Sequence, residues 1–397
     1  MGRGCVQFFF MYSGVLFMST VSVSCVRPDP LASSIKVLSD AALLFVKQSM
    51  PEVKPGVVEL DEEYDARSWL AFRLLPLLQD LVATKHQLYS VGHAKNGEAR
   101  ITFHSLGRRF INCIKRDIRI SFEMFPSAQF NPYFEVFYSA VLKHHLVPSE
   151  TSFSGTKGEH VNEAVHRLNA CISEFRAEVS TVEFRSRLKA FRRPIKRQYD
   201  TLMRYTAELF ARHSRMLILR VDLSYLQKYR LAKHITGTDA CRHRDMLLKD
   251  LQNGAFGPML GYACKLELGR YKGYHIHGLF FFDSSAMCKD VILGKRIGQH
   301  WDKVITGGMG SHYNCNARKE RYKKCFLGLA HCTDPIAREG FELYAAYATK
   351  PDELLRLALP GIQAFIRGRL APRKEGPRRG RPRAAEKGRD QWPESLR

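Results

Sequence analysis

The 397-residue sequence predicts an α+β protein, in which a central antiparallel sheet flanked by helices follows a mainly helical N-terminal region. Apolar residues recur at helical spacing through much of the first 210 residues, whereas long apolar runs typical of buried strands begin at residue 216. Two such runs, at 261–268 and 274–282, are separated by a short segment with two glycines, which indicates a hairpin.

The composition favours a polyanionic partner. The chain carries 62 Lys and Arg residues against 39 Asp and Glu, a net charge of +23. Such an excess is typical of proteins that bind nucleic acid or an anionic membrane. The ten cysteines are spread singly without a C-x-x-C pair, so neither a zinc ribbon nor a disulfide framework is indicated. Reduced thiols are the simplest interpretation.

Residues 1–26 are predicted to be an apolar leader or an over-extended start. A charged beginning, an apolar run at 6–16 and small residues at 19–24 resemble a signal peptide. The apolar run is short for a membrane span and is interrupted by polar and small residues. We expect an over-extended or incidental N-terminus, with Met11 or Met18 as candidate true starts, and membrane targeting is the alternative.

Residues 27–150 are predicted to be mainly helical. Apolar spacing indicates helices near 34–50 and 68–89, and a strand-like segment lies at 99–103. No catalytic motif stands out in this region. A segment rich in Ser, Thr and Gly at 149–158 is typical of a linker.

The region 151–211 is predicted to contain this linker and a basic helix. Helical spacing extends from 161 to 215, and Pro194 is expected to kink or divide the helix. Its basic face is either an ordinary solvated surface or a surface that contacts DNA phosphates. The candidate DNA-binding residues on it are Arg192, Arg193 and Lys196.

The region 212–360 is predicted to hold the sheet and the functional site. The strand at 216–225 begins with residues that are apolar on both faces, which favours a central position in the sheet. Arg220 and Asp222 share one face, because side chains alternate along a strand. They form either a buried ion pair or part of a cleft lining, and in the cleft they are candidate DNA-binding residues.

Two histidines interrupt the apolar strand at 274–282. His275 and His277 point to the same face, about 7 Å apart along the strand. A hairpin centred on Tyr271 places Glu267 opposite His275, and the three side chains then form a donor set suited to a divalent metal. A register shifted by one residue would turn Glu267 away, and the two histidines would then be polar residues on a solvated strand face.

A helix at 289–306 is followed by a polar segment with five residues that could bind zinc. Their spacing matches no established zinc-binding pattern. These residues are His312, Cys315, Cys325, His331 and Cys332.

Asp334 and Pro335 predict the start of the next helix, because Asp caps helix N-termini and Pro suits the first turn. Tyr344, Tyr347 and Lys350 follow at a spacing that places them roughly on one helix face. Two tyrosines in a helix usually pack in a core or an interface, but a tyrosine one turn from a lysine is also a candidate reactive group.

Residues 361–397 are predicted to be a basic disordered tail, rich in Arg, Lys, Pro and Gly. Part of it resembles an AT-hook, whose arginines enter the narrow minor groove of A·T-rich DNA. A nonspecific basic tail is the alternative. The candidate DNA-binding residues are Arg379, Arg381 and Arg383.

Three blocks together resemble the HUH endonuclease superfamily: R-V-D-L-S-Y at 220–225, H-I-H at 275–277 and Y-A-T-K at 347–350. Their order most closely resembles the inovirus replication-initiation proteins, the gene-two-like family that shares the YagK/YfjJ C-terminal domain. The resemblance covers 212–353. It implies an HUH/Rep-type antiparallel sheet with helices beside it and the histidine pair on a central strand.

The resemblance implies a metal centre and a tyrosine nucleophile. His275 and His277 would be metal ligands, and Glu267, eight residues earlier, resembles the third ligand of related initiators. Mg²⁺ or Mn²⁺ is the expected cofactor, since mixed His and carboxylate ligands suit these ions, and Zn²⁺ remains an alternative.

Tyr347 would attack the DNA phosphate, with Lys350 to stabilise the phenolate, orient the phosphate or assist the leaving group. Some initiators of this type use two tyrosines, so Tyr344 is either a second nucleophile or a packing residue.

The resemblance implies a rolling-circle replication initiator that nicks and rejoins single-stranded DNA at an origin through a phosphotyrosine intermediate. The alternatives are a relaxase or transposase of the same superfamily, or a DNA-binding regulator without catalysis. The expected partners are single-stranded and origin DNA, with a host replication helicase or polymerase as a further one. No membrane partner is expected, and the expected location is the cytoplasm of a bacterial host cell.

Overall fold

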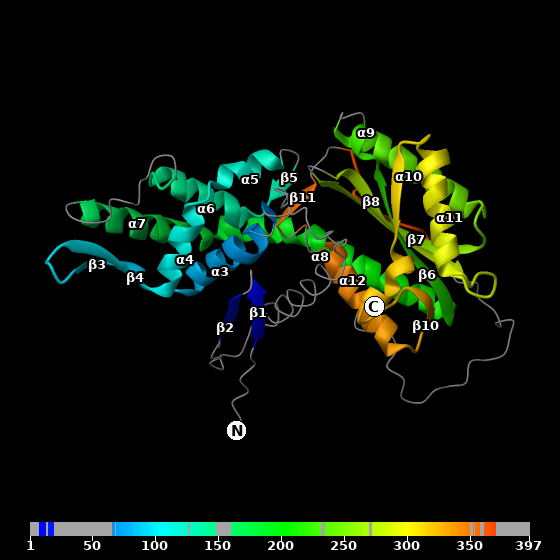
Figure 1. Ribbon diagram of the computed structural model, residues 1–397, viewed down its shortest axis with the longest axis horizontal. Coiled ribbons are helices and arrows are strands. Elements are labelled where there is room, and N and C mark those ends of the chain that lie inside the picture. Colours follow the sequence, from blue (N-terminus) through cyan, green and yellow to red (C-terminus); the bar gives the residue numbers. More distant parts are fainter. Residues whose placement is uncertain are drawn as a thin grey trace, which may run out of the picture.

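The computed structural model describes residues 8–12, 15–19, 66–67, 69–125, 128–147, 160–231, 235–269, 272–349, 352, 354–357 and 361–370. In these residues the chain is a mixed α+β protein, which confirms the predicted class. A helical N-terminal part lies beside a C-terminal part that contains the main sheet (Figure 1). Within the predicted leader, β1 (Phe8–Tyr12) pairs with β2 (Val15–Ser19).

The N-terminal part is built around a hydrophobic core that includes Leu77, Phe110 and Phe137. Its elements are a π-helical turn (Leu70–Leu74), α3 (Leu75–Ala83), β3 (Tyr89–His93), β4 (Ala99–Phe103), α4 (Ser105–Ile114), α5 (Ile118–Met124), β5 (Ala128–Phe130), α6 (Pro132–Lys143) and α7 (Val161–Val179). The strand predicted at 99–103 is present, but its partner β3 was not predicted. An alternating pattern of only five residues is too short to stand out beside the helical spacing that precedes it.

The helical segment predicted at 161–215 is divided at a different place than expected. Thr181 starts a new helix, α8 (Val182–Arg212), and its side chain accepts a 3.0 Å hydrogen bond from the Phe184 amide. Pro194 neither ends nor divides α8. The first half of α8 packs on the N-terminal core and the second half on the main sheet, so α8 connects the two parts (Figure 1).

The C-terminal part is built on a six-stranded antiparallel sheet. Its strands are β6 (Arg215–Tyr225), β7 (Met259–Gly269), β8 (Gly273–Asp283), β9 (Gly310–Asn314), β10 (Gly328–His331) and β12 (Phe365–Arg367). The order is β10-β6-β8-β7-β12, and β9 pairs with the second half of β6 on the side away from β8. The strand predicted at 216–225 is therefore central, as its apolar beginning indicated.

Helices cover both faces of the sheet. On one face, α8 and α12 (Pro335–Thr349) pack against Ile218 and Phe281. On the other face, α10 (Gly237–Gln252) and α11 (Asp290–His300) pack against Leu217 and Phe280. The remaining elements are α9 (Gln227–Leu231), a π-helical turn (Trp301–Ile305), a 3₁₀ helix (Cys315–Arg321) and β11 (Leu355–Leu357), which pairs with β5. Among the described helices, none is both long enough and apolar enough to cross a membrane.

The beginning of the predicted disordered tail belongs to the sheet. β12 pairs with the edge strand β7, and Phe365 lies opposite Lys265. This pairing depends on the free hydrogen-bonding edge of β7, which the basic composition of the tail does not reveal. The tail residues predicted to bind DNA, Arg379, Arg381 and Arg383, lie outside the described residues.

Candidate active site

The β7–β8 hairpin has the register that the sequence predicts. Glu267 lies opposite His275, and Lys265 lies opposite His277. On the other side of β8, Asp222 of β6 also lies opposite His277. Three side chains, those of Asp222, His277 and Lys265, therefore form a row across three neighbouring strands. Glu267 and His275 lie next to this row on the same face.

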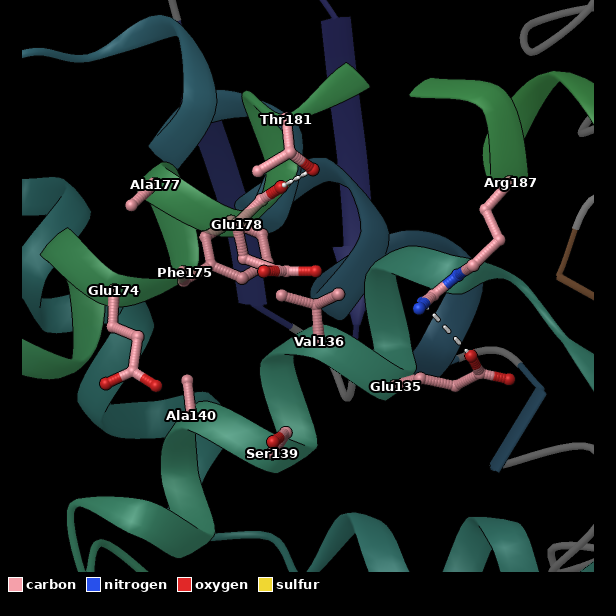
Figure 2. A pocket seen from close by; sticks show the side chains of 10 residues that line it. All are labelled: Glu135, Val136, Ser139, Ala140, Glu174, Phe175, Ala177, Glu178, Thr181 and Arg187. Carbon is pink, nitrogen blue, oxygen red and sulfur yellow. Dashed lines mark hydrogen bonds and ion pairs between the residues drawn. The ribbon is translucent and has the colours of Figure 1, made fainter. Parts of the chain in front are cut away.

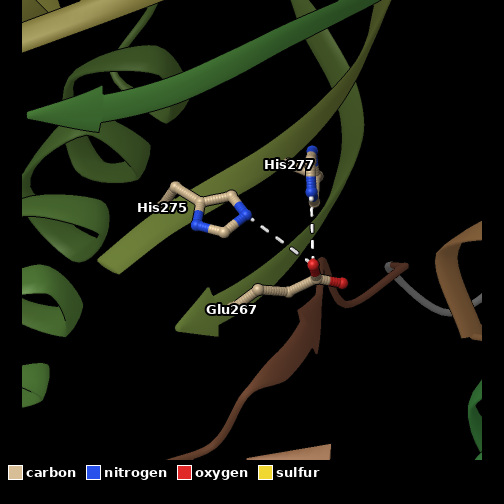
Figure 3. Close-up of side chains that lie close together, drawn as sticks. All are labelled: Glu267, His275 and His277. Atoms are coloured by element: carbon tan, nitrogen blue, oxygen red, sulfur yellow. Dashed lines mark ion pairs between the residues drawn. The ribbon is translucent and has the colours of Figure 1, made fainter. Parts of the chain in front are cut away.

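The side chains of Glu267, His275 and His277 converge on one point and are called the metal-type cluster below (Figure 3). The Oε2 atom of Glu267 lies 3.7 Å from Nε2 of His275 and 3.6 Å from Nε2 of His277. The three ligand atoms lie within 4.8 Å of one another. Metal–ligand bonds of about 2.1 Å place neighbouring ligand atoms roughly 3.0–3.4 Å apart, so the three side chains would draw closer together on binding one ion. In the described part of the chain, this is the one group of three or more ligand-type side chains close enough to share a metal.

The hydrogen bonds of the two imidazoles suit metal binding. The Nδ1 atom of His275 lies 3.0 Å from the carbonyl oxygen of Gly273, and Nδ1 of His277 lies 2.9 Å from Oδ1 of Asp222. Each Nδ1–H can donate to its oxygen partner, which leaves each Nε2 to offer a lone pair to an ion. Two imidazole nitrogens and one carboxylate oxygen therefore face one point, and this donor set fits a divalent metal.

Without a metal, the carboxylates around His277 favour its protonated form. Burial alone would lower the pKa of His277, but the charges of Asp222 and Glu267 outweigh burial and raise this pKa to about 9. Burial would raise the pKa of Asp222, but the Arg220 guanidinium and His277 hold it well below its usual range. Metal binding at Nε2 would release the extra proton of His277.

Arg220 holds Asp222 in place beside His277. Its Nε and Nη2 atoms each donate a 3.0 Å hydrogen bond to the Asp222 carboxylate, and the Arg220 side chain is 2% exposed. The sequence left open a buried ion pair or a face shared with the histidines, and the structure contains both, because Asp222 pairs with Arg220 and also lies beside His277. Arg220 therefore acts on the site through Asp222. The burial of the Arg220 side chain argues against the predicted DNA contact.

Tyr347 of α12 faces the metal-type cluster. Its ring centre lies 6.5 Å from that of His277 and 5.4 Å from the Arg220 guanidinium carbon. The side chain is half-buried at the edge of the α12 packing surface. Burial raises the pKa of the Tyr347 phenol, and the positive charge of Arg220 opposes this rise. The Tyr347 ring thus lies near both the buried Arg220 cation and the His277 imidazole.

Tyr344 occupies a packing position. It is 3% exposed, and its ring centre lies 5.2 Å from that of Phe326 and 6.1 Å from that of Phe341. Three residues along an α-helix correspond to a rotation of about 300°, so the two tyrosines point in directions about 60° apart. This offset directs Tyr344 into the core and leaves Tyr347 at its edge. Of the two roles predicted for Tyr344, the geometry favours packing.

The sequence analysis missed Lys265, which links the metal-type cluster to the end of α12. Its Nζ atom lies 3.2 Å from Oε1 of Glu267 and 3.0 Å from Oδ1 of Asp352, and it also donates to the carbonyl of Ala348. Burial would lower the pKa of Lys265, but the Asp352 and Glu267 carboxylates raise it, so the 4% exposed side chain is charged. One signal was present, since the predicted register places Lys265 directly opposite His277.

The other predicted site residues lie outside this cluster or outside the described residues. Lys350 directly follows the last described residue of α12 and is itself outside them. On α8, Arg193 and Lys196 are exposed and Arg192 is half-buried, and Lys196 forms a 2.6 Å ion pair with Asp200. The predicted contacts of this helix with phosphates stay a prediction.

A surface pocket of about 490 Å³ lies in the N-terminal part, beside α6 and the junction of α7 and α8 (Figure 2). It is lined by Glu135, Val136, Ser139, Ala140, Glu174, Phe175, Ala177, Glu178, Thr181 and Arg187. Arg187 forms a 3.2 Å ion pair with Glu135, and Glu174 binds Lys143 and His144 at 2.9 Å. Its three carboxylates disfavour a polyanion, and none of its lining residues belongs to the metal-type cluster.

Comparisons with protein-family models, curated proteins and solved structures found no match for this chain. Its function is therefore inferred from the residues and their geometry.

Proposed function

We propose that this chain is a metal-dependent tyrosine endonuclease of the HUH type, which nicks and rejoins single-stranded DNA at the replication origin of a phage-like element. The main support is that Glu267, His275 and His277 form a metal-type cluster beside Tyr347. The net charge of +23 supports a nucleic acid as the substrate. The three sequence blocks that resemble the superfamily contribute both histidines and the tyrosine.

In the proposed reaction, Tyr347 is the nucleophile. A phenol has a pKa near 10 and must lose its proton to attack, and the Arg220 cation beside the ring stabilises the phenolate. The phenolate oxygen forms a bond to phosphorus, the bond from phosphorus to the 3′ oxygen breaks, and the 3′ oxygen takes up a proton. The 5′ phosphate stays bound to Tyr347. Attack by a 3′-hydroxyl reverses these changes and rejoins the strand.

The proposed cofactor is Mg²⁺ or Mn²⁺, which would polarise the scissile phosphate and offset negative charge in the transition state. The chain itself orients the ligands. Asp222 and the Gly273 carbonyl fix the two imidazoles through their Nδ1 atoms, and Lys265 holds Glu267 through its second oxygen. Tyr347 is held by the packing of α12 on the sheet.

The test is a nicking assay with the full-length protein and labelled single-stranded fragments that cover the genomic region encoding it. With Mn²⁺ we expect a nick at one position and a protein–DNA adduct that survives denaturing electrophoresis. Both should disappear with EDTA and in His275→Ala, whereas the adduct should persist in Lys303→Ala, a matched exposed-surface control. Cleavage without an adduct, or cleavage in EDTA, would contradict the proposal.

A further inference from the structure

The β3–β4 hairpin is a separate feature that the proposed active site does not use. It projects from the N-terminal part at the end away from the six-stranded sheet (Figure 1). Its turn is well defined, because the Ala94 amide donates a 2.8 Å hydrogen bond to the Glu98 carbonyl and Gly97 adopts a φ of 80°. The hairpin is therefore an ordered element presented to solvent.

The two faces of this hairpin differ. Tyr89 on the inner face is buried in the N-terminal core, and Ile101 packs against that core. On the outer face, Ser90 pairs with Thr102 and Gly92 pairs with Arg100. The hydroxyls of Ser90 and Thr102 lie 2.7 Å apart. The outer face is thus small, polar and positively charged, and it carries no aromatic side chain.

The base of the hairpin is fixed to α7 and α4 by polar contacts. The Asn169 side chain accepts hydrogen bonds from the amides of Leu88 and Tyr89 at 3.3 Å and donates to the Tyr89 carbonyl at 2.8 Å. The Tyr89 hydroxyl donates to the Gly107 carbonyl at 2.6 Å. Arg176 of α7 donates to the His86 carbonyl at 3.0 Å. These bonds hold a solvated hairpin in one orientation, as a binding element requires.

The charges around the hairpin favour an anionic partner. Between residues 85 and 109 the chain has five basic side chains and one acidic side chain. Arg109 is paired with Asp80 at 2.6 Å. Lys85, Lys95 and Arg100 are exposed, and in the described part of the chain no ion pair to them is found. Their charges are therefore available to a ligand.

We propose that the β3–β4 hairpin is a second DNA-binding element, which contacts the phosphates of duplex DNA beside the single-stranded site. This inference rests on the proposed function only in taking DNA as the partner. A two-stranded ribbon fits the major groove of a duplex, and Arg, Lys, Ser and Thr are common phosphate ligands. Single-strand sites use aromatic side chains on which bases stack, and the outer face has none.

The test compares duplex and single-strand binding of the full-length protein. Fluorescence anisotropy is measured with a duplex of about 30 base pairs of arbitrary sequence and with one of its strands, at several salt concentrations. For the double variant Lys95→Ala/Arg100→Ala we expect about a tenfold higher Kd for the duplex, a salt slope smaller by about 1–2, and an unchanged Kd for the single strand. Lys295→Ala/Lys303→Ala is the matched control, because it removes the same charge from exposed positions on α11 and the following turn.

Equal losses in the two double variants would overturn the proposal, because net charge alone would then explain binding. A loss on the single strand as large as on the duplex would also overturn it. So would a smaller assembly of the hairpin variant in sedimentation, which would indicate that the hairpin pairs with a second copy. The nicking assay separates the two proposals: an adduct with unchanged duplex binding refutes the hairpin alone, and a selective duplex loss without an adduct refutes the nickase alone.

Discussion

His277 is protonated in the metal-free folded protein, so the free energy of unfolding should fall as the pH rises and this proton is lost. The pKa of His277 is about 9 in the folded protein, whereas the ordinary pKa of a histidine side chain is 6.5. Because the folded state binds this proton more tightly, the stabilisation is complete below pH 6.5 and is lost as the pH rises through 9. A difference of about 2.5 pKa units corresponds to roughly 3 kcal/mol in the free energy of unfolding.

The measurement is urea unfolding in EDTA at about pH 6 and about pH 9.5, for the wild type and His277→Gln. Glutamine keeps a hydrogen-bond donor near Asp222 but cannot become charged. The free-energy difference between the two proteins should shrink by roughly 3 kcal/mol between the lower and the higher pH. His275→Gln changes the other histidine of the cluster and leaves the Asp222–His277 pair intact, so it should retain the wild-type dependence. The same pH dependence in the wild type and His277→Gln would refute the reasoning.

Two further substitutions test the groups that support the cluster. Asp222→Asn should weaken Mn²⁺ binding about 10- to 100-fold in calorimetry, because the carboxylate orients His277, and an unchanged affinity would exclude that role. Lys265→Met should lower the free energy of unfolding by about 3 kcal/mol in urea, because it leaves two half-buried carboxylates without their buried cation. Lys303→Met, at an exposed position, should change it by less than about 0.5 kcal/mol, and an equally small effect of Lys265→Met would contradict the role of that lysine.

The metal-type cluster could be predicted because it depends on local rules. Alternation along a strand places His275 and His277 on one face, and a short glycine-bounded turn sets the register that brings Glu267 opposite His275. The central position of the strand at 216–225 also followed from local pattern, because residues apolar on both faces need cover on both sides.

The supporting groups could not be predicted in the same way, because their roles depend on tertiary packing. Lys265 stays charged in its buried position partly because the segment after α12 brings Asp352, 87 residues away, to its ammonium group. The difference between Tyr344 and Tyr347 depends on how α12 is rotated against the sheet, which helical spacing alone does not define. The pairing of β12 with β7 likewise depends on a free sheet edge.

The most direct test of the central claim is to locate the covalent bond. The adduct formed with Mn²⁺ and single-stranded DNA is digested with nuclease and protease, and the peptide that retains a nucleotide is sequenced by tandem mass spectrometry. We expect the nucleotide phosphate on Tyr347 in both the wild type and Tyr344→Phe, and no adduct in Tyr347→Phe. A nucleotide on Tyr344, or an adduct that persists in Tyr347→Phe, would contradict the assignment.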